Sequence, residues 1–525
     1  MSKLSRRKFL GYTALTTAAL AEMTTISLSG CTKENYQQEA HYKAIVIGSG
    51  FGGSVAALRL TEKGIPTLLL EMGKFYDTTT SNNTFSPTLP PDNRSTWLEN
   101  NTELPFGLNL PIGNKFVGVL DKVTYPNMAI YRNICLGGGS ISNGGVLLAP
   151  NEYYFNRYIS TEINYQELAA KYIPLAKQMF SANVMPDDLF NSSYYQFAQV
   201  AKKHALKSGF DISHAHSFYN FDIWRQEMNG TIQKSALKGE LLYGNNNGIK
   251  NSLDKNYLSL ALATSQLTIK TLRKVYDINY KDELYIITVQ QIDEQGTVVQ
   301  HEQYTSEYLF ICAGSVGSSE LLLQAKHKNR LPNLNDEVGR NWGSNGNTFA
   351  IRGKLNEATG NMHSSPPTLS VYDFNNPYTP LAAMQDIFPI GIDLKSLLMV
   401  GQPFVESRGH FEVINNQVQL NWSSNAMEQG KLAMEHFINK LNTDNGGEID
   451  TNFIKEGVST NFTYHPLGGV VLGKASDWYG RLNGYKKLYA IDGSMLPGNS
   501  AMVNPTLLIT ALAERNMEKI LAEDF

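Results

Sequence analysis

Short apolar runs and a glycine-rich turn organise the start of the chain. Residues 44–47 form an apolar run typical of a buried parallel strand, and the turn follows at once. Apolar residues then recur at helical spacing from Val55 to Leu60, and Gly64 ends that segment. A second apolar run, 67–70, ends in an acidic residue. The pattern predicts strand, helix and strand, the βαβ unit of parallel sheets.

After residue 160 the pattern predicts first helices and then strands. Apolar residues at helical spacing predict helices over 165–180 and 194–208. From residue 265 the spacing shortens to that of strands, and a buried strand over 309–314 leads into a helix over 315–324. Four runs separated by short polar turns predict an antiparallel meander: 268–272, 275–280, 283–290 and 297–304.

The C-terminal third begins with a predicted hairpin and an amphipathic helix. It ends with a buried strand followed by a helix, as at the start of the chain. Asn415-Asn416 between two apolar runs predicts a hairpin, and 428–442 has the pattern of an amphipathic helix. An apolar strand over 488–493 then ends in Asp-Gly. A long helix follows over 507–521, with Asn504 predicted as its cap and Pro505 in its first turn.

These elements predict an α/β protein (α+β overall) with two discontinuous domains. A Rossmann-like dinucleotide-binding domain is expected from residues 41–157, 235–350 and 455–525. A substrate-binding domain built on an antiparallel sheet is expected from residues 158–234 and 351–454. At 525 residues the chain is long enough for both.

The first turn carries the Gly-x-Gly-x-x-Gly dinucleotide fingerprint. Gly48 allows the tight turn, Gly50 lets backbone N–H groups reach a pyrophosphate, and Gly53 lets the helix pack closely on the strand. Glu71, at the end of the second strand, can accept hydrogen bonds from ribose hydroxyls. Glycine-rich turns also join strands to helices for structural reasons alone, but here strand, helix and acid are all in register. The fingerprint by itself leaves FAD and NAD open.

Two further segments have two interpretations each. The glycine-rich stretch 136–145 is either a second turn against a cofactor or a mobile surface loop, and its apolar flanks argue against mobility. The stretch 74–114 is rich in Asn, Thr, Ser and Pro and long for a connector. It is either a lid or binding loop or a segment that wraps the surface.

Composition and charge exclude some classes of protein. Hydrophobic residues make up 42% and charged residues 18%, as in ordinary globular proteins. The formal net charge of -3, with no basic run beyond the N-terminus, argues against a nucleic-acid partner. Cys135 and Cys312 are expected to be buried thiols rather than a disulfide, and no metal-ligand spacing is present.

The N-terminus predicts export and a lipid anchor. Residues 5–10, SRRKFL, form a twin-arginine pattern, and a modestly apolar run follows that is too short for a membrane span. Residues 28–31, LSGC, resemble a lipobox, so residues 1–30 are expected to be a signal and Cys31 the lipid attachment site in the cell envelope. The alternative is a disordered cytoplasmic tail.

The motifs together resemble one family, the glucose–methanol–choline (GMC) oxidoreductases, and within it the non-covalent FAD cholesterol oxidases. The matching motifs run in the family's order over residues 42–525. They are IGSGFGGSVAALRL, LLEMG, LGGGSISNGG, ICAGSVGSSELL, LPNLNDEVGRNWGSNGN, YHPLGGVVLGKASD and IDGSMLPG followed by VNPT. The resemblance implies FAD as the cofactor, so the dinucleotide-binding domain is the expected FAD-binding domain.

The resemblance also implies site residues. His465 and Asn504 fall on the family's catalytic pair, and Asp386 falls where the family has the glutamate that moves a proton from C4 to C6. Thr506 stands where an aromatic residue is usual, and Val146 where methionine is usual. The cofactor-binding residues expected from fingerprint and resemblance are Gly48, Gly50, Phe51, Gly52, Gly53, Glu71, Gly139, Asn143, Gly144, Val146, Val275, Asp492, Gly493 and Thr506.

The activity expected from this resemblance is oxidation of 3β-hydroxysterols. Hydride would pass from C3 to flavin N5, and O₂ would be reduced to H₂O₂, with isomerisation of the Δ5 double bond to Δ4 slowed or lost because Asp386 is one methylene shorter than glutamate. A dehydrogenase of another apolar alcohol is the first alternative. A sterol-binding envelope protein without catalysis is the second, and the intact His465 and Asn504 argue against it.

Overall fold

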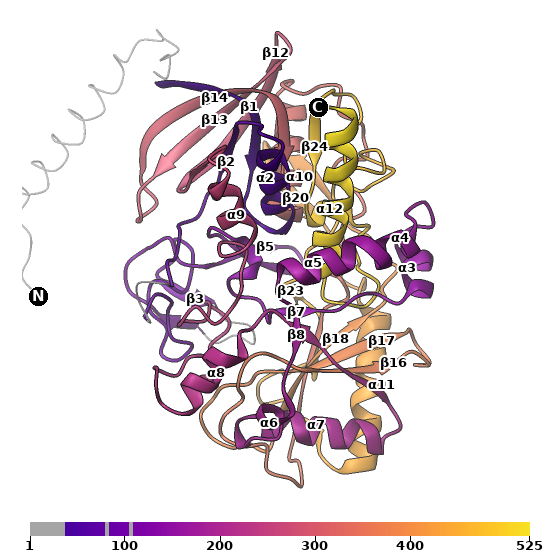
Figure 1. Ribbon diagram of the computed structural model, residues 1–525. Coiled ribbons are helices and arrows are strands. Elements are labelled where there is room, and N and C mark those ends of the chain that lie inside the picture. The colour runs from indigo at the N-terminus through magenta and orange to yellow at the C-terminus, as the bar shows by residue number, and fades with distance from the viewer. Residues whose placement is uncertain (1–36, 79–82, 104–108) are drawn as a thin grey trace, which may run out of the picture. The chain divides into compact units, whose positions relative to one another are not determined.

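The computed structural model describes residues 37–78, 83–103 and 109–525 (Figure 1). The predicted signal and Cys31 lie outside these residues, as do parts of the stretch 74–114. Within the described ranges, no helix combines the length and apolar character that crossing a bilayer requires.

The predicted βαβ unit is present. Strand β1 (Gln37–Ile47) leads through the glycine turn into helix α2 (Phe51–Glu62), and β2 (Thr67–Leu70) returns parallel to β1, with Ala44 opposite Thr67 and Ile47 opposite Leu70. All four residues of β2 are buried, as expected for a strand covered on both faces.

The first sheet has the order β11-β2-β1-β14-β13-β12, with β24 beside β14. The meander prediction was wrong for its first strand: β11 (Leu267–Lys270) pairs parallel with β2. Leu272, with φ +58°, then turns the chain away. The last strand is also longer than predicted and runs on into the parallel part. The remaining strands are β12 (Arg273–Lys281), β13 (Leu284–Ile292), β14 (Val298–Ile311) and β24 (Leu488–Ala490).

The two faces of this sheet are covered differently. Val46 packs in a core with α2, α9 (Tyr257–Ala263) and α12 (Thr506–Glu523). Ile45, one residue earlier, faces the meander and α10 (Gly314–His327). Figure 1 shows α2 and α12 side by side on the sheet. The alternation of strand side chains therefore builds two cores from one apolar run.

The second sheet is antiparallel, as predicted for the substrate-binding domain, with the order β21-β15-β18-β17-β16-β9 and β22 beside β15. Helices α7 (Gln196–Lys207) and α11 (Glu428–Asn445) pack on one face of it. Its strands are β9 (Asp211–His214), β15 (Thr348–Gly353), β16 (Leu369–Asp373), β17 (Leu381–Asp386), β18 (Leu397–Pro403), β21 (Glu448–Ile449) and β22 (Val458–Ser459).

The remaining strands form small sheets outside the two large ones. The predicted hairpin is present as β19 (His410–Ile414) and β20 (Gln417–Asn421), with positive φ at Asn415 and Asn416. The other strands are β3 (Asn101–Glu103), β4 (Asn109–Pro111), β5 (Leu120–Tyr125), β6 (Met128–Asn133), β7 (Val146–Leu147), β8 (Asn183–Val184), β10 (His216–Ser217) and β23 (Phe462–Thr463). The other helices are η2 (Gly138–Ser140), α3 (Glu152–Tyr158), α4 (Tyr165–Glu167), η3 (Leu168–Tyr172), α5 (Ile173–Met179), α6 (Asp187–Phe190), η4 (Ser193–Tyr195), α8 (Phe221–Met228), η5 (Ala236–Lys238) and η6 (Gly493–Met495).

Candidate active site

One cavity of about 1550 Å³ extends from the first glycine turn to His465. Typical small-molecule sites occupy roughly 300–1,000 Å³, so this cavity has room for a large cofactor and a substrate together. Thr88, Leu89 and Trp97 of the stretch 74–114 also line it, which favours the binding-loop interpretation of that stretch. Of the residues predicted from the sequence, the following line the cavity: Gly48, Gly50, Phe51, Gly52, Glu71, Gly139, Asn143, Gly144, Val146, Val275, Asp386, His465, Asp492, Gly493, Asn504 and Thr506.

The first glycine turn has one open position among packed ones. A Cβ on Gly48 would lie 2.3 Å from the Cys312 carbonyl oxygen, and one on Gly52 would lie 1.6 Å from the Ile491 oxygen. A Cβ on Gly50 would meet nothing within 4 Å, because Gly50 borders the cavity. Gly53 lies behind the turn and packs α2 on the strand, so it does not line the cavity.

The amino end of α2 is open to a ligand. Gly50 is its N-cap and no side chain caps it, so the first N–H groups of the helix lie beside the cavity. Such a helix end binds phosphate through N–H donors and the helix dipole. This part of the cavity therefore fits a pyrophosphate.

Glu71 is held by its own neighbours. Its Oε2 accepts hydrogen bonds from the Ser49 N–H (3.0 Å) and Ser49 Oγ (2.6 Å), and its Oε1 accepts one from the Gly73 N–H (2.8 Å). Burial raises the pKa of this carboxyl. Its predicted contact with a ribose uses oxygens that already accept these bonds, and it stays a prediction.

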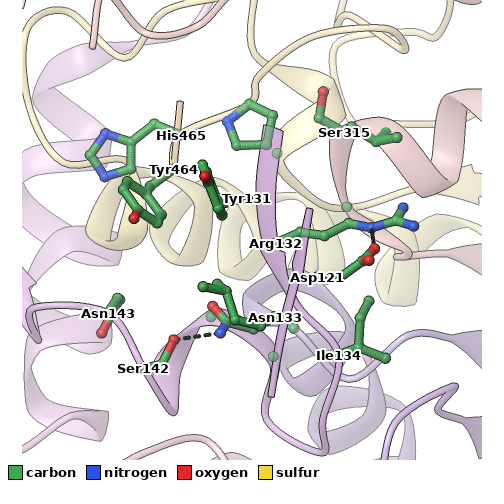
Figure 2. Close-up of a pocket in the computed structure, with 18 of the residues that line it drawn as sticks. Asp121, Tyr131, Arg132, Asn133, Ile134, Ser142, Asn143, Ser315, Tyr464 and His465 are labelled. Atoms are coloured by element: carbon green, nitrogen blue, oxygen red, sulfur yellow. Dashed lines mark hydrogen bonds and ion pairs between the residues drawn. The ribbon is translucent and has the colours of Figure 1, made fainter. Parts of the chain in front are cut away.

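The second glycine turn packs against the first. A Cβ on Gly138 would lie 2.9 Å from the Gly50 Cα, which explains why glycine is needed there and excludes the mobile-loop interpretation. Asn143 Nδ2 donates to Thr506 Oγ1 (3.2 Å), which joins this turn to the start of α12. Figure 2 shows Ser142 and Asn143 on this turn, with Ser142 bonded to Asn133.

His465 is held in one orientation by an amide. Asn347 Nδ2 lies 2.9 Å from His465 Nδ1, and Asn347 Oδ1 accepts the Tyr464 N–H (3.1 Å). Because a backbone N–H can only donate, the Asn347 oxygen must face Tyr464 and its NH₂ must face the imidazole. His465 Nδ1 is therefore an acceptor, and the ring proton of the neutral imidazole is on Nε2.

His465 is also kept neutral. Burial lowers its pKa to about 4, because the charged imidazolium loses its hydration. In Figure 2, His465 and Tyr464 lie on the same segment at the pocket wall. The site thus offers a hydrogen-bond donor, Nε2–H, rather than a positive charge.

The prediction that Asn504 caps α12 was wrong. Pro505 is the N-cap and no side chain bonds the first turn. The carboxamide of Asn504 makes no hydrogen bond within the described residues, and its Oδ1 is buried. An amide oxygen without a protein partner beside a cavity fits a group that bonds cofactor or substrate. Its catalytic role stays a prediction.

Asp386 ends β17 and lines the same cavity. Within the described residues, its Oδ1 accepts a hydrogen bond from the Ile387 N–H (2.7 Å). Burial raises its pKa to about 6. A carboxyl of this kind exchanges protons near neutral pH, as a general base requires.

Asp492 has a structural role. Its Oδ2 accepts hydrogen bonds from the Gly314 N–H (2.8 Å) and Ser318 Oγ (2.5 Å), and its Oδ1 accepts one from the Ser494 N–H (2.8 Å). The carboxylate ties the start of α10 to the segment that carries Gly493. Asp492 therefore shapes the cavity wall while its oxygens are already engaged.

Sequence reasoning missed three residues that the structure brings to the site. Asn347 orients His465 from 118 positions away. Lys250 is buried, and its Nζ donates to the Asn143 carbonyl oxygen (2.6 Å) from beneath the second glycine turn. Gln402 lines the cavity from β18. Asn347 ends the motif LPNLNDEVGRNWGSNGN, but neither that motif nor the sequence around Lys250 and Gln402 indicates what each side chain contacts.

The two cysteines of the described residues are thiols rather than a disulfide. Cys135 and Cys312 are both free and buried, as predicted. No group of three or more metal-binding side chains occurs in the described ranges.

Comparisons with known proteins agree with the family resemblance. Residues 345–454 match the family described as GMC oxidoreductase, C-terminal, and residues 418–513 match GMC oxidoreductase. Cholesterol oxidase of Acinetobacter baumannii is 23% identical over 92% of this chain and 95% of its own length. Cholesterol oxidase of Mycobacterium tuberculosis is 24% identical over 90% of both chains.

Among solved structures, pyridoxine 4-oxidase from Mesorbium loti has the same fold. The two superpose with a TM-score of 0.63 at 14% identity, over 92% of this chain and 100% of that one. A likeness at this identity supports the fold and leaves the substrate open.

The cavity fits the cofactor of this family, FAD. The open Gly50 and the uncapped end of α2 suit a pyrophosphate, and the volume suits the whole dinucleotide. Asn504, whose Oδ1 has no protein partner, and His465 line the same cavity. The C-terminal part of the chain matches the GMC oxidoreductase family models, and the chain as a whole resembles the FAD-dependent cholesterol oxidases of that family.

Proposed function

We propose that this protein oxidises the 3β-hydroxyl of sterol-like alcohols to a ketone. The observation that carries the proposal is the pairing of His465 and Asn504 with an apolar cavity wall in one continuous cavity. FAD, when bound, supplies the acceptor for the C3 hydride and passes the electrons to O₂, which gives H₂O₂. The apolar lining residues include Phe349, Met384, Leu398, Val400 and Phe462.

His465 would orient the alcohol rather than deprotonate it. As the hydride leaves C3, the hydroxyl proton would pass to water in the cavity, and reduction of O₂ to H₂O₂ takes up a proton in turn. Its Nε2–H donates to the substrate oxygen, because Asn347 occupies Nδ1 as a donor. The free carboxamide of Asn504 gives the hydroxyl a second partner. Two fixed hydrogen bonds to one oxygen define the direction of the carbinol C–H, which is the main requirement of a hydride transfer.

Asp386 is proposed as the base of a second step, isomerisation of the Δ5 double bond to Δ4. Its raised pKa suits proton exchange. The short side chain limits its reach from C4 to C6, so isomerisation is expected to be slower than oxidation or lost. The absorbance of the conjugated product follows this step, and full-speed isomerisation in Asp386→Asn would contradict the assignment.

A dehydrogenase of another apolar alcohol uses the same residues with a different electron acceptor. Pyridoxine 4-oxidase has the same fold and, by its name, a different substrate. A sterol-binding protein without catalysis is disfavoured by the ordered His465–Asn347 pair, since binding alone needs no fixed tautomer. A colourless purified protein would favour that alternative.

Export is proposed on sequence grounds alone. The twin-arginine pattern and Cys31 predict a lipid-anchored envelope protein, which would place the enzyme near membrane sterols. Mass spectrometry of the N-terminal peptide from cell envelopes tests this: a diacylated Cys31 supports it, and an intact residue 1–30 segment contradicts it.

The deciding experiment uses purified, FAD-loaded protein with cholesterol under air and a peroxide-coupled dye. The proposal predicts peroxide in proportion to ketone formed. Turnover with an artificial electron acceptor but without peroxide would support the dehydrogenase instead. A cofactor-loaded protein that oxidises aryl or short-chain alcohols but no sterol would overturn the substrate assignment.

A further inference from the structure

One face of the second sheet lines the cavity, and every second residue of its strands points to that face. On β18, Leu398, Val400 and Gln402 line the cavity, whereas Leu397 and Met399 pack in the helix-covered core on the other face. This is the period of two that a strand imposes. Gln402 is thus aimed into the cavity by the same alternation that aims Leu398 and Val400 there.

Gln402 is buried and has no partner among the described residues. The residue as a whole is 4% exposed, and no hydrogen bond from or to its carboxamide occurs within 37–78, 83–103 and 109–525. The carboxamide is open to the cavity, so it takes its hydrogen-bond partners from whatever fills the cavity. The cavity that Gln402 lines is the remaining source of a partner.

The register of β18 with β15 places Gln402 near His465. Gly401 pairs with Thr348 of β15. The same register, continued by one residue, brings Gln402 opposite Asn347. Opposite residues of an antiparallel pair share a face and have Cβ atoms about 5 Å apart. Asn347 in turn bonds His465 (2.9 Å), so the Gln402 amide lies close to where the substrate hydroxyl would be held.

We propose that Gln402 is a specificity-determining residue that hydrogen-bonds a second oxygen of the substrate, on a carbon close to the carbinol carbon. The proposal rests on the proposed function and narrows its substrate class to sterol-like alcohols with an additional oxygen near C3. A neutral amide donates and accepts, so it suits a hydroxyl or keto oxygen rather than an ion. An apolar side chain at this position would serve a substrate with a single hydroxyl better.

The test compares three sterols that differ in the place of the second oxygen. Cholesterol has one hydroxyl, 4β-hydroxycholesterol carries a second one next to C3, and 25-hydroxycholesterol carries it at the far end. The kcat/KM of each is measured by peroxide release for the parent and Gln402→Leu. Met399→Leu, on the same strand but facing the core, is the matched control.

The parent is expected to prefer 4β-hydroxycholesterol to 25-hydroxycholesterol by roughly tenfold or more, as one buried hydrogen bond implies. Gln402→Leu should lose this preference and keep or improve its kcat/KM for cholesterol, while Met399→Leu keeps the parent's ratio. Gln402→Met replaces Gln402→Leu should the latter fail to fold.

Three results would overturn the proposal. Equal kcat/KM for the two diols in the parent would show that no second oxygen is recognised near C3. A uniform loss for all three sterols in Gln402→Leu would mean that the amide contacts the carbinol oxygen itself. An FAD-loaded parent that oxidises none of the three would overturn the sterol assignment together with this proposal, whereas the first two results leave that assignment intact.

Discussion

Asn347 holds His465 in a single tautomer. The Asn347 NH₂ donates to Nδ1 at 2.9 Å because its oxygen is occupied by the Tyr464 N–H at 3.1 Å. Thr463 Oγ1 donates to the same oxygen at 2.8 Å and strengthens this orientation. The consequence is an imidazole that donates from Nε2, so the chemistry of His465 depends on a residue that need not touch the substrate.

Asn347→Asp should reverse this polarity while keeping the shape of the side chain. An ionised carboxylate accepts from Nδ1–H, which removes the proton from Nε2 or favours the charged imidazolium. The expected loss in kcat is roughly 10²-fold near neutral pH. Activity should recover partly at low pH, where the protonated carboxyl can again donate to Nδ1.

The matched control for that variant is Asn356→Asp, the same change at an exposed position. It should keep the parent's kcat and pH profile. An Asn347→Asp enzyme whose profile has the parent's shape would show that the tautomer of His465 does not matter.

His465→Ala should leave the protein yellow but nearly inactive. The side chain lines the cavity wall without supporting the first glycine turn, so FAD binding should persist. Turnover is expected to fall by roughly 10²–10⁴-fold or more. Visible absorbance and peroxide release measured on the same sample separate the two effects; a variant that oxidises sterol nearly as fast as the parent would refute the assignment.

Gly50→Val should weaken FAD binding without unfolding the apoprotein. Gly50 has φ -67°, which any residue adopts, and a Cβ there meets no protein atom within 4 Å. The added side chain would instead enter the space proposed for the pyrophosphate. Gly52→Ala is the contrasting variant, because its Cβ would lie 1.6 Å from the Ile491 oxygen.

Thermal unfolding of the apoproteins and FAD titration measure the two outcomes. Gly50→Val should match the parent in apoprotein Tm and bind FAD at least roughly tenfold more weakly. Gly52→Ala should lower the apoprotein Tm itself. Parent-like FAD affinity in Gly50→Val would place the pyrophosphate elsewhere.

The two steps should differ in their pH dependence. Burial lowers the pKa of His465 to about 4, so the imidazole is neutral at any higher pH. The rate of oxidation should therefore stay constant as the pH is lowered towards about 4. Asp386 has a pKa of about 6 and acts as a base only when ionised. Any isomerisation should therefore rise with pH through about 6 and be lost below it. Rates of ketone formation and of conjugated enone formation, measured in parallel, check this; parallel profiles would argue against Asp386.

Local sequence patterns predicted the first βαβ unit well, because apolar period, turn glycines and the terminal acid all favour one structure. They failed for β11, whose Leu267 and Ile269 suit either a meander or a parallel edge strand. Only the pairing with β2 decides between the two, and pairing depends on residues about 200 positions apart in the chain.

The site was predicted where a motif carries the chemistry and missed where distant residues meet. The glycine turns and His465 are parts of compact motifs. Asn347, Lys250 and Gln402 come to the site from distant parts of the chain, and no spacing rule links their positions to it. For Asn504 the local pattern was misleading. Its position before Pro505 is typical of a helix cap, but in the fold its Oδ1 makes no hydrogen bond to the protein.

The most direct test of the account is an anaerobic titration of the FAD-loaded protein with cholesterol, followed by admission of air. One equivalent of sterol should bleach the yellow flavin of the parent, whereas His465→Ala should stay yellow. Air should then restore the colour of the parent with release of one equivalent of H₂O₂. A flavin that stays oxidised in the parent protein with excess sterol would contradict it.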